Sequence, residues 1–137
     1  MTHETKLRVR FCEIDPYKVV WHGHYISWFE VGRNELTSLF GIGPEDLRQM
    51  GLMAPVVELH CKFKLPAKFG DEVLIQTTMQ RCEVAKLIFH YKVIRDDRIL
   101  AEGSTTHVLT DLQGTMLYQV PQRVKRRLEE MMEYLGV

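Results

Sequence analysis

The sequence has 137 residues, of which 45% are hydrophobic and 26% are charged. This composition is typical of a folded globular protein and this length of one domain, so we expect residues 1–137 to form a single unit. Lysine and arginine together number 18, as do aspartate and glutamate. The resulting absence of net charge argues against nucleic acid or an anionic membrane surface as the partner.

No apolar run approaches the roughly 20 residues of a membrane-spanning helix, and residues 1–10 are polar and charged, without the features of a secretion signal. The cysteines Cys12, Cys61 and Cys82 are far apart and include no C-x-x-C pair. They predict free thiols that act as small buried hydrophobic side chains, not a disulfide or a zinc site. We therefore expect a cytoplasmic protein without an integral membrane segment.

The first expected element is a strand over residues 6–13, because apolar and polar side chains alternate there with a period of two. Leu7, Val9 and Phe11 share one side of this strand. Asp15-Pro16 should end it, since proline donates no amide hydrogen and restricts the residue before it. A loop follows, through residue 21.

Apolar residues recur at helical spacing from residue 22 to residue 40, and the glycines and proline of residues 41–44 form a stop signal. These apolar residues are Tyr25, Ile26, Trp28, Phe29, Leu36, Leu39 and Phe40. Val31 and Gly32 widen the apolar surface, so we expect a long, largely buried helix with a sheet wrapped around it. Gly32 costs about 1 kcal/mol relative to alanine. It either permits the close approach of a strand or is simply tolerated.

The remaining chain is mainly extended. We expect a short helix over residues 45–50 and strands over residues 54–65, 72–82, 86–95 and 99–111. Gly70-Asp71 and Asp96-Asp97 supply turns between them, and these direct connections favour antiparallel pairing within one sheet.

Pro121 opens a last helix with one apolar face. That face contains Val124, Leu128, Met131, Met132 and Leu135. Basic residues precede acidic ones on the same helix, so packing explains the pattern better than nucleic-acid binding. The order of elements predicts an α+β architecture in which a curved antiparallel sheet wraps around one long helix.

The segment FCEIDPYKVVWHGHYISWFE, residues 11–30, resembles the signature of the 4-hydroxybenzoyl-CoA thioesterase family and its YbgC-like branch. In that signature a strand is followed by an Asp, six residues, and a helix start rich in His, Asn or Tyr. The segments LPAKFGDEV, AEGSTTHVLTD and PQRVKRRLE are similar to later parts of the same family, so the resemblance covers nearly the whole chain. It implies the hotdog fold and the hydrolysis of an acyl-CoA thioester.

The resemblance also implies roles for particular residues. Asp15 would be the catalytic carboxylate, either as nucleophile or as base for a water molecule, although Asp-Pro is also an ordinary turn. His22 would be catalytic through its backbone amide and its imidazole. Together with Gly23 it lies at a helix start, where unpaired amides and the helix dipole favour the negative charge of a thioester oxygen under attack.

The sequence departs from the YbgC-like pattern in two places. Phe11 stands where those proteins often have a tyrosine, and Pro16-Tyr17-Lys18 replaces a smaller, glycine-rich turn. Tyr17 and Trp21 are candidates for lining an apolar acyl pocket. Lys62 and Lys64 are candidates for binding the phosphates of coenzyme A, and Lys68, Arg81 and Lys86 are weaker ones.

Several alternatives stay open. A hotdog hydratase or dehydratase would act on the same class of substrate, another thioesterase branch would use Glu30 or Glu35 within the long helix, and a non-catalytic acyl-CoA-binding module would only bind. We expect no metal, because His22 and His24 point in nearly opposite directions on a helix, and no cofactor other than coenzyme A in the substrate. Because a monomer would leave a sheet edge open, we expect a homodimer or homotetramer.

Overall fold

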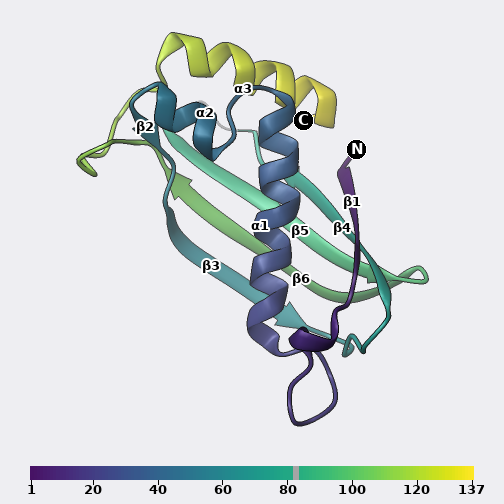
Figure 1. Ribbon diagram of the computed structural model, residues 1–137. Coiled ribbons are helices and arrows are strands. Elements are labelled where there is room, and N and C mark those ends of the chain that lie inside the picture. Colours follow the sequence, from purple (N-terminus) through teal and green to yellow (C-terminus); the bar gives the residue numbers. More distant parts are fainter. Residues whose placement is uncertain (82–83) are drawn as a thin grey trace.

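The computed structural model describes residues 1–81 and 84–137. One long helix lies across the face of a curved sheet, and two further helices lie at one end of it (Figure 1). The helices are α1 (His22–Leu39), α2 (Pro44–Gln49) and α3 (Gln122–Leu135), and η1 (Phe11–Glu13) is a short 3-10 helix. The strands are β1 (His3–Arg8), β2 (Leu52–Met53), β3 (Val56–Phe63), β4 (Glu72–Met79), β5 (Lys86–Arg95), β6 (Arg98–Val108) and β7 (Thr110–Asp111).

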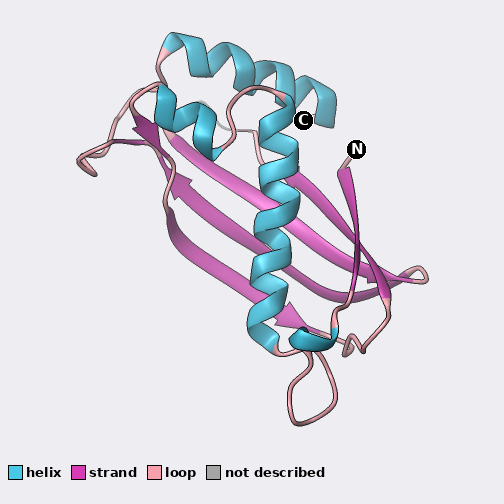
Figure 2. Ribbon diagram, in the orientation of Figure 1, coloured by secondary structure: helices cyan, strands magenta, loops and turns pink. Residues whose placement is uncertain are grey.

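The main sheet has the strand order β1-β4-β5-β6-β3, and every neighbouring pair is antiparallel (Figure 2). The turn between β5 and β6 contains Asp96 and Asp97 with φ angles of 49° and 65°, as a tight hairpin turn requires. The predicted antiparallel sheet around one long helix, the hotdog architecture, is confirmed. β3 lies at the end of the order, so within the described chain one of its sides has no strand partner.

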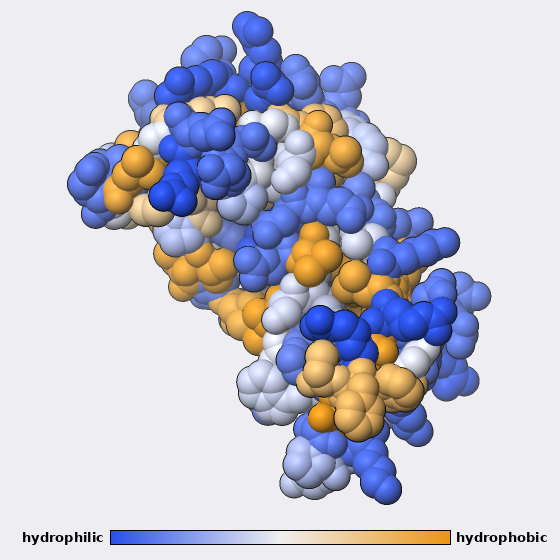
Figure 3. Space-filling model, viewed as in Figure 1, coloured by the Kyte–Doolittle hydropathy of each residue, from blue (hydrophilic) through white to orange (hydrophobic). Residues whose placement is uncertain are grey.

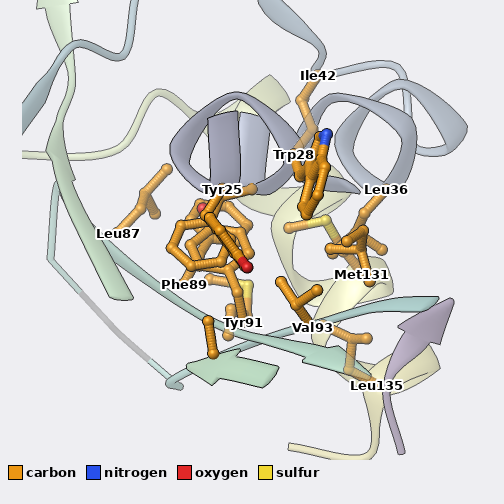
Figure 4. Packing of buried hydrophobic residues seen from close by; sticks show 14 of the residues in the cluster. Tyr25, Trp28, Leu36, Ile42, Leu87, Phe89, Tyr91, Val93, Met131 and Leu135 are labelled. Atoms are coloured by element: carbon orange, nitrogen blue, oxygen red, sulfur yellow. The ribbon is translucent and has the colours of Figure 1, made fainter. Parts of the chain in front are cut away.

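The core lies between α1 and the sheet, where side chains from both layers meet (Figure 4). The ring of Phe29 on α1 stacks on that of Tyr91 on β5, with centroids 4.5 Å apart and planes 7° from parallel. α3 closes one end of this layer. Its predicted apolar face is confirmed, since five side chains are 4% exposed or less: Val124, Leu128, Met131, Met132 and Leu135.

Two glycines allow α1 and the strands to approach closely. A Cβ atom on Gly32 of α1 would lie 2.6 Å from Oγ1 of Thr77 in β4. A Cβ atom on Gly103 of β6 would lie 2.4 Å from the carbonyl oxygen of His60 and 2.7 Å from the ring of Phe29. All three distances are far below ordinary van der Waals contact. Gly32 therefore permits the close approach of a strand, which decides between the two interpretations of this residue.

The predicted bounds of the first strand are wrong. In place of a strand over residues 6–13, β1 ends early and the chain turns through η1. The turn forms because a carboxylate oxygen of Glu13 accepts a hydrogen bond of 2.8 Å from the amide of Arg10. Val9 is buried as expected, but Phe11 is 78% exposed. Alternation along a sequence cannot reveal such a side-chain contact.

The strand predicted over residues 54–65 is confirmed in shorter form as β3, and the two-residue β2 lies just before the predicted bounds. Pro55 lies between them and has no amide hydrogen to donate to a neighbouring strand. β2 pairs with β7 in a small second sheet, so the expectation of a single sheet is wrong. The strand predicted over residues 72–82 ends as β4 at Met79, and Cys82 lies outside the described residues.

The cysteines are less buried than predicted. Cys12 is exposed and Cys61 is half-buried, and within the described residues both are free thiols. Partial burial raises the pKa of the Cys61 thiol and so keeps it in its unreactive form.

α1 is also more exposed than predicted. Ile26 and Val31 are 37% and 42% exposed, and Leu39 is 61% exposed, because the sheet covers only one side of the helix. No helix in the described ranges, 1–81 and 84–137, is long and apolar enough to cross a membrane.

Candidate active site

A narrow loop between η1 and α1 carries Asp15 (Figure 1). Its two arms are joined by backbone contacts: a bridge between Ile14 and Val20, and hydrogen bonds of 2.9 Å from Asp15 to Val19 and from Trp21 to Glu13. Lys18 completes the turn with a positive φ of 65°. The loop projects from the end of the molecule at which α1 begins, so Asp15 and the helix start belong to the same end of the fold.

The Asp15 carboxylate is half-buried at the base of this loop. Its Oδ1 atom accepts a hydrogen bond of 2.8 Å from the amide of Tyr17, a local contact that fixes the side chain. In the part of the chain that the structure describes, its Oδ2 atom has no hydrogen-bond or ion-pair partner. The carboxylate therefore keeps one oxygen available for a substrate or a water molecule.

The start of α1 offers backbone donors. Trp21 precedes the helix with an extended backbone and contributes no side-chain cap, and the first intrahelical donor is the amide of His24. The amides of His22 and Gly23 make no hydrogen bond among the described residues. Two unpaired amides at the positive end of an 18-residue helix form a site that favours negative charge.

Trp21 lies over this helix start. A Cβ atom on Gly23 would lie 2.1 Å from the indole of Trp21, so only a glycine leaves room for the ring. The imidazoles of His22 and His24 both contact the same indole, with centroid distances of 4.9 Å and 5.5 Å. The ring of His22 also lies 6.3 Å from that of Phe63 at the end of β3. Trp21 is therefore placed beside the unpaired amides of His22 and Gly23.

Tyr17 is placed differently from Trp21. It is 86% exposed at the tip of the loop, whereas Trp21 is 48% exposed. The tip projects away from both α1 and the sheet (Figure 1), and Tyr17 is not among the residues that line the three pockets found in the described residues.

Glu13 is a residue of this region that the sequence interpretation missed. Its side chain is 4% exposed, and it accepts hydrogen bonds from the Arg10 amide at 2.8 Å and from the indole nitrogen of Trp28 at 3.0 Å. Burial opposes ionisation, but these bonds and the Arg10 guanidinium outweigh it and lower the pKa of the Glu13 carboxyl. The anion thus ties the base of the Asp15 loop to α1.

Lys62 and Lys64 lie away from this site. Phe63 contacts Tyr25 of α1 at a centroid distance of 5.2 Å, so its strand neighbours on either side face the opposite surface of the sheet. Nζ of Lys64 forms an ion pair of 2.7 Å with Glu102, and this pair lowers the pKa of the Glu102 carboxyl. The structure does not bring the two lysines together with Asp15 or the start of α1.

A pocket lies farther along α1, between that helix, α2, α3 and the ends of β5 and β6. Its volume is about 480 Å³, and its walls are mainly apolar. Arg33 lines it from α1, and His107 lines it from β6. Asp15 is not among its lining residues.

The two glutamates of the alternative thioesterase branch have different surroundings. Glu35 accepts hydrogen bonds from Nε2 of His3 at 2.8 Å and from the hydroxyl of Thr5 at 3.1 Å, so it ties α1 to β1. Glu30 is exposed at the rim of the pocket.

Comparison with known proteins identifies the reaction class. The family model described as "Thioesterase-like superfamily" matches residues 9–128. The acyl-CoA thioesterase YbgC of Haemophilus influenzae is 24% identical over 120 residues, which cover 87% of this chain and 88% of that protein.

Solved structures share the fold of this chain. The hypothetical protein TT1821 from Thermus thermophilus is 31% identical with a TM-score of 0.86, covering 94% of this chain and 98% of that one. A DHNA-CoA thioesterase from Staphylococcus aureus also has a TM-score of 0.86, covering 98% of this chain and 91% of that one; at 21% identity it shows the shared fold alone. On the family match, which spans most of the sequence, the chain belongs to the thioesterase-like superfamily.

Proposed function

We propose that this chain hydrolyses the thioester of an acyl-coenzyme A and releases a free acid and coenzyme A. The observation that carries the proposal is the pair of unpaired amides at the start of α1, at the same end of the molecule as the loop that bears Asp15. Membership of the thioesterase-like superfamily and the name of the YbgC relative support the reaction class.

The chemistry needs an attacking oxygen and donors for the carbonyl oxygen, which gains negative charge during the attack. The Asp15 carboxylate supplies the first, as nucleophile or as base for water. The amides of His22 and Gly23 supply the second, and the dipole of α1 adds to their effect. The His22 imidazole, at the same helix end, is our candidate proton donor to the departing thiolate. No cofactor is needed, and a cytoplasmic location is part of the proposal.

A dimer formed through β3 would complete the site. Within the described chain, β3 uses one side to pair with β6, and several of its apolar side chains are exposed, including Val57 at 58% and Phe63 at 47%. Figure 3 shows hydrophobic side chains over this edge of the molecule. An apolar edge strand of eight residues is a hazard that natural proteins cover, and pairing with a second copy would cover it.

Antiparallel pairing of two β3 strands around a twofold axis has a geometric consequence. The pocket opens at the beginning of β3, beside Pro55 and Val56, whereas the start of α1 lies beside Phe63 at the other end. The axis would place the partner's helix start next to the pocket of this chain, on the same face of the joined sheet. The acyl group would then enter a pocket of one protomer while the other protomer holds the thioester.

Replacement of Asp15 tests the chemistry. Asp15→Asn keeps an oxygen for the Tyr17 amide, so the loop should retain its shape, but it removes the carboxylate. We expect kcat to fall by about a hundredfold to ten-thousandfold on the best acyl-CoA of a panel. Asp97→Asn, in the distant turn between β5 and β6, is the matched control and should keep full activity. Full activity of Asp15→Asn would overturn the assignment.

The dimer has its own test. Leu59 lies in the middle of β3 and is 39% exposed. We expect Leu59→Lys to shift the protein from dimer to monomer in sedimentation velocity and to abolish turnover. A wild-type protein that sediments as a monomer at micromolar concentration would contradict this arrangement.

The same preparations separate the alternative functions. Hydration of an enoyl-CoA without thiol release would favour a hydratase. Tight binding of acyl-CoA thioethers without any turnover of the corresponding thioesters would favour a binding module.

A further inference from the structure

The pocket beside α1 contains a guanidinium without an anionic partner. Arg33 is half-buried and lines the pocket among apolar side chains that include Phe89 and Leu109. In the described ranges, none of the ion pairs includes Arg33. Its one side-chain hydrogen bond runs from Nη1 to the hydroxyl of Tyr91, at 3.1 Å. The other N–H groups of this fork remain available to a ligand.

A chain of hydrogen bonds holds Arg33 in this position. The carbonyl of Ala54 can only accept, so Nδ1 of His107 donates to it at 2.9 Å, which leaves Nε2 as an acceptor for the hydroxyl of Thr105 at 2.8 Å. Thr105 must then accept from the hydroxyl of Tyr91, at 2.6 Å. The Tyr91 oxygen is thus left to accept from Arg33.

The hydrogen bonds in this series all run in one direction, and the side chains that accept from Arg33, directly or in turn, carry no negative charge. Burial, together with the Arg33 charge, lowers the pKa of His107, so its imidazole is neutral at pH 7. Burial raises the pKa of Tyr91, so its phenol is neutral as well. This series of hydrogen bonds therefore orients the guanidinium of Arg33 without compensating its positive charge. The carboxylates that line the pocket, Glu30 and Glu45, are both exposed at its rim.

An oriented cation in an apolar pocket is best complemented by a carboxylate, which a guanidinium binds through two parallel hydrogen bonds. We propose that the pocket selects acyl groups with a carboxylate at the end remote from the thioester, and that Arg33 is the residue that binds this carboxylate. The inference rests on the proposed thioesterase function. It names the substrate class as the half-thioesters of dicarboxylic acids, with an apolar chain between their two ends.

The test uses acyl-CoAs of equal chain length that differ only at the far end. Hexanoyl-CoA ends in a methyl group, 6-hydroxyhexanoyl-CoA in a hydroxyl and adipoyl-CoA in a carboxylate; decanoyl-CoA and sebacoyl-CoA form a longer pair. A charge-assisted hydrogen bond contributes about tenfold to a hundredfold in affinity. We expect kcat/KM for the carboxylate member to exceed that for its methyl partner by about this factor, at the chain length that spans the pocket.

Three variants distinguish a specific contact with Arg33 from a general effect of the positive charges that line the pocket. Arg33→Met should lower kcat/KM for the carboxylate member far more than for the methyl member and so bring the ratio of the two kcat/KM values close to one. Arg48→Met removes a positive charge from the exposed side of the same pocket and should leave the ratio unchanged. Tyr91→Phe keeps the Arg33 charge but removes its anchor, so we expect a partial loss of discrimination.

Binding is measured separately from turnover. The thioethers S-hexyl-CoA and S-(5-carboxypentyl)-CoA resist hydrolysis, and isothermal titration with the wild type and Arg33→Met gives their affinities. If the wild type binds the carboxylate thioether preferentially and Arg33→Met loses this preference, the inference is supported. This holds even if no thioester is hydrolysed, because the absence of hydrolysis would defeat only the proposed function. Equal effects of Arg33→Met on both members of every pair, or a preference for the hydroxyl over the carboxylate, would overturn the inference. Thermal melts confirm that each variant is folded.

Discussion

Glu13 offers the sharpest test of how this fold positions the loop that carries Asp15. Its carboxylate accepts two short hydrogen bonds, from the Arg10 amide at 2.8 Å and from the Trp28 indole at 3.0 Å. Glu13→Gln preserves the size of the side chain. However, the glutamine NH₂ group must face one of these two donors, so one bond is lost and one buried donor has no acceptor.

The magnitude follows from the type of bond. A hydrogen bond to a charged group contributes about 1.5–3 kcal/mol, and a donor left buried without a partner costs about 1–3 kcal/mol. Neighbouring atoms can move and recover part of this loss. We therefore expect the free energy of unfolding to fall by about 2–3 kcal/mol at pH 7. Glu72→Gln is the control. Among the described residues the Glu72 carboxylate pairs only with Arg8, in an exposed ion pair of 3.5 Å, so this substitution should cost well under about 1 kcal/mol.

The effect should also depend on pH in a defined direction. The folded-state pKa of Glu13 lies below its ordinary value of 4.5. A carboxyl with a lowered pKa contributes stability that is fully present above the unfolded value and is lost as the pH falls through the folded value. The difference between wild type and Glu13→Gln should thus be constant above about pH 5 and shrink in more acidic solution.

Urea denaturation followed by tryptophan fluorescence, at several pH values, measures this difference directly. Equal stability of the two proteins at neutral pH would refute the role of the Glu13 anion. So would a difference that persists unchanged down to the lowest pH at which the protein is folded. A matching loss of thioesterase activity in Glu13→Gln would link the contact to the placement of Asp15.

Two further predictions concern the core. Gly103→Ala should lower the melting temperature more than Gly32→Ala does. The new Cβ at position 103 would strike the backbone oxygen of His60, whereas the Thr77 hydroxyl beside Gly32 can rotate away. We expect Gly103→Ala to lower the free energy of unfolding by about 1–3 kcal/mol. Since burial lowers the pKa of His107 from its ordinary value of 6.5, stability should be full above that pH and decrease as the pH falls toward the folded value. An NMR titration in which the His107 imidazole protonates at or above pH 6.5 would contradict this.

Periodicity predicted the parts of the fold whose stability depends on burial alone. The apolar spacing located α1 within one residue and gave all five buried positions of α3, because helix faces in contact with a core require that spacing. It failed where a polar side chain redirects the backbone. The turn at η1 depends on Glu13, which reads as an ordinary surface glutamate in the sequence, and Phe11 was consequently assigned to the wrong face.

The candidate site was predictable only where residues are close in sequence. Asp15, Trp21, His22 and Gly23 lie within nine positions, so a local pattern contains them. The hydrogen-bond chain from Arg33 to His107 joins residues of α1, β5 and β6, and alternation along β6 suggested only that His107 belongs to a strand. The pairing of strands, which no local pattern shows, brings these side chains together.

α1 connects the two halves of the proposed mechanism. Eleven residues separate His22 from Arg33, which is about 16 Å along a helix. Both residues lie on the same continuous helix, so this distance is fixed within one protomer. In the proposed β3-paired dimer, however, the thioester would lie at the partner's helix start, and the register of the two β3 strands would set its distance from Arg33. A register shift of two residues would change that distance by about 7 Å. The proposed arrangement therefore makes the preferred length of the acyl chain depend on the dimer interface as well as on the pocket.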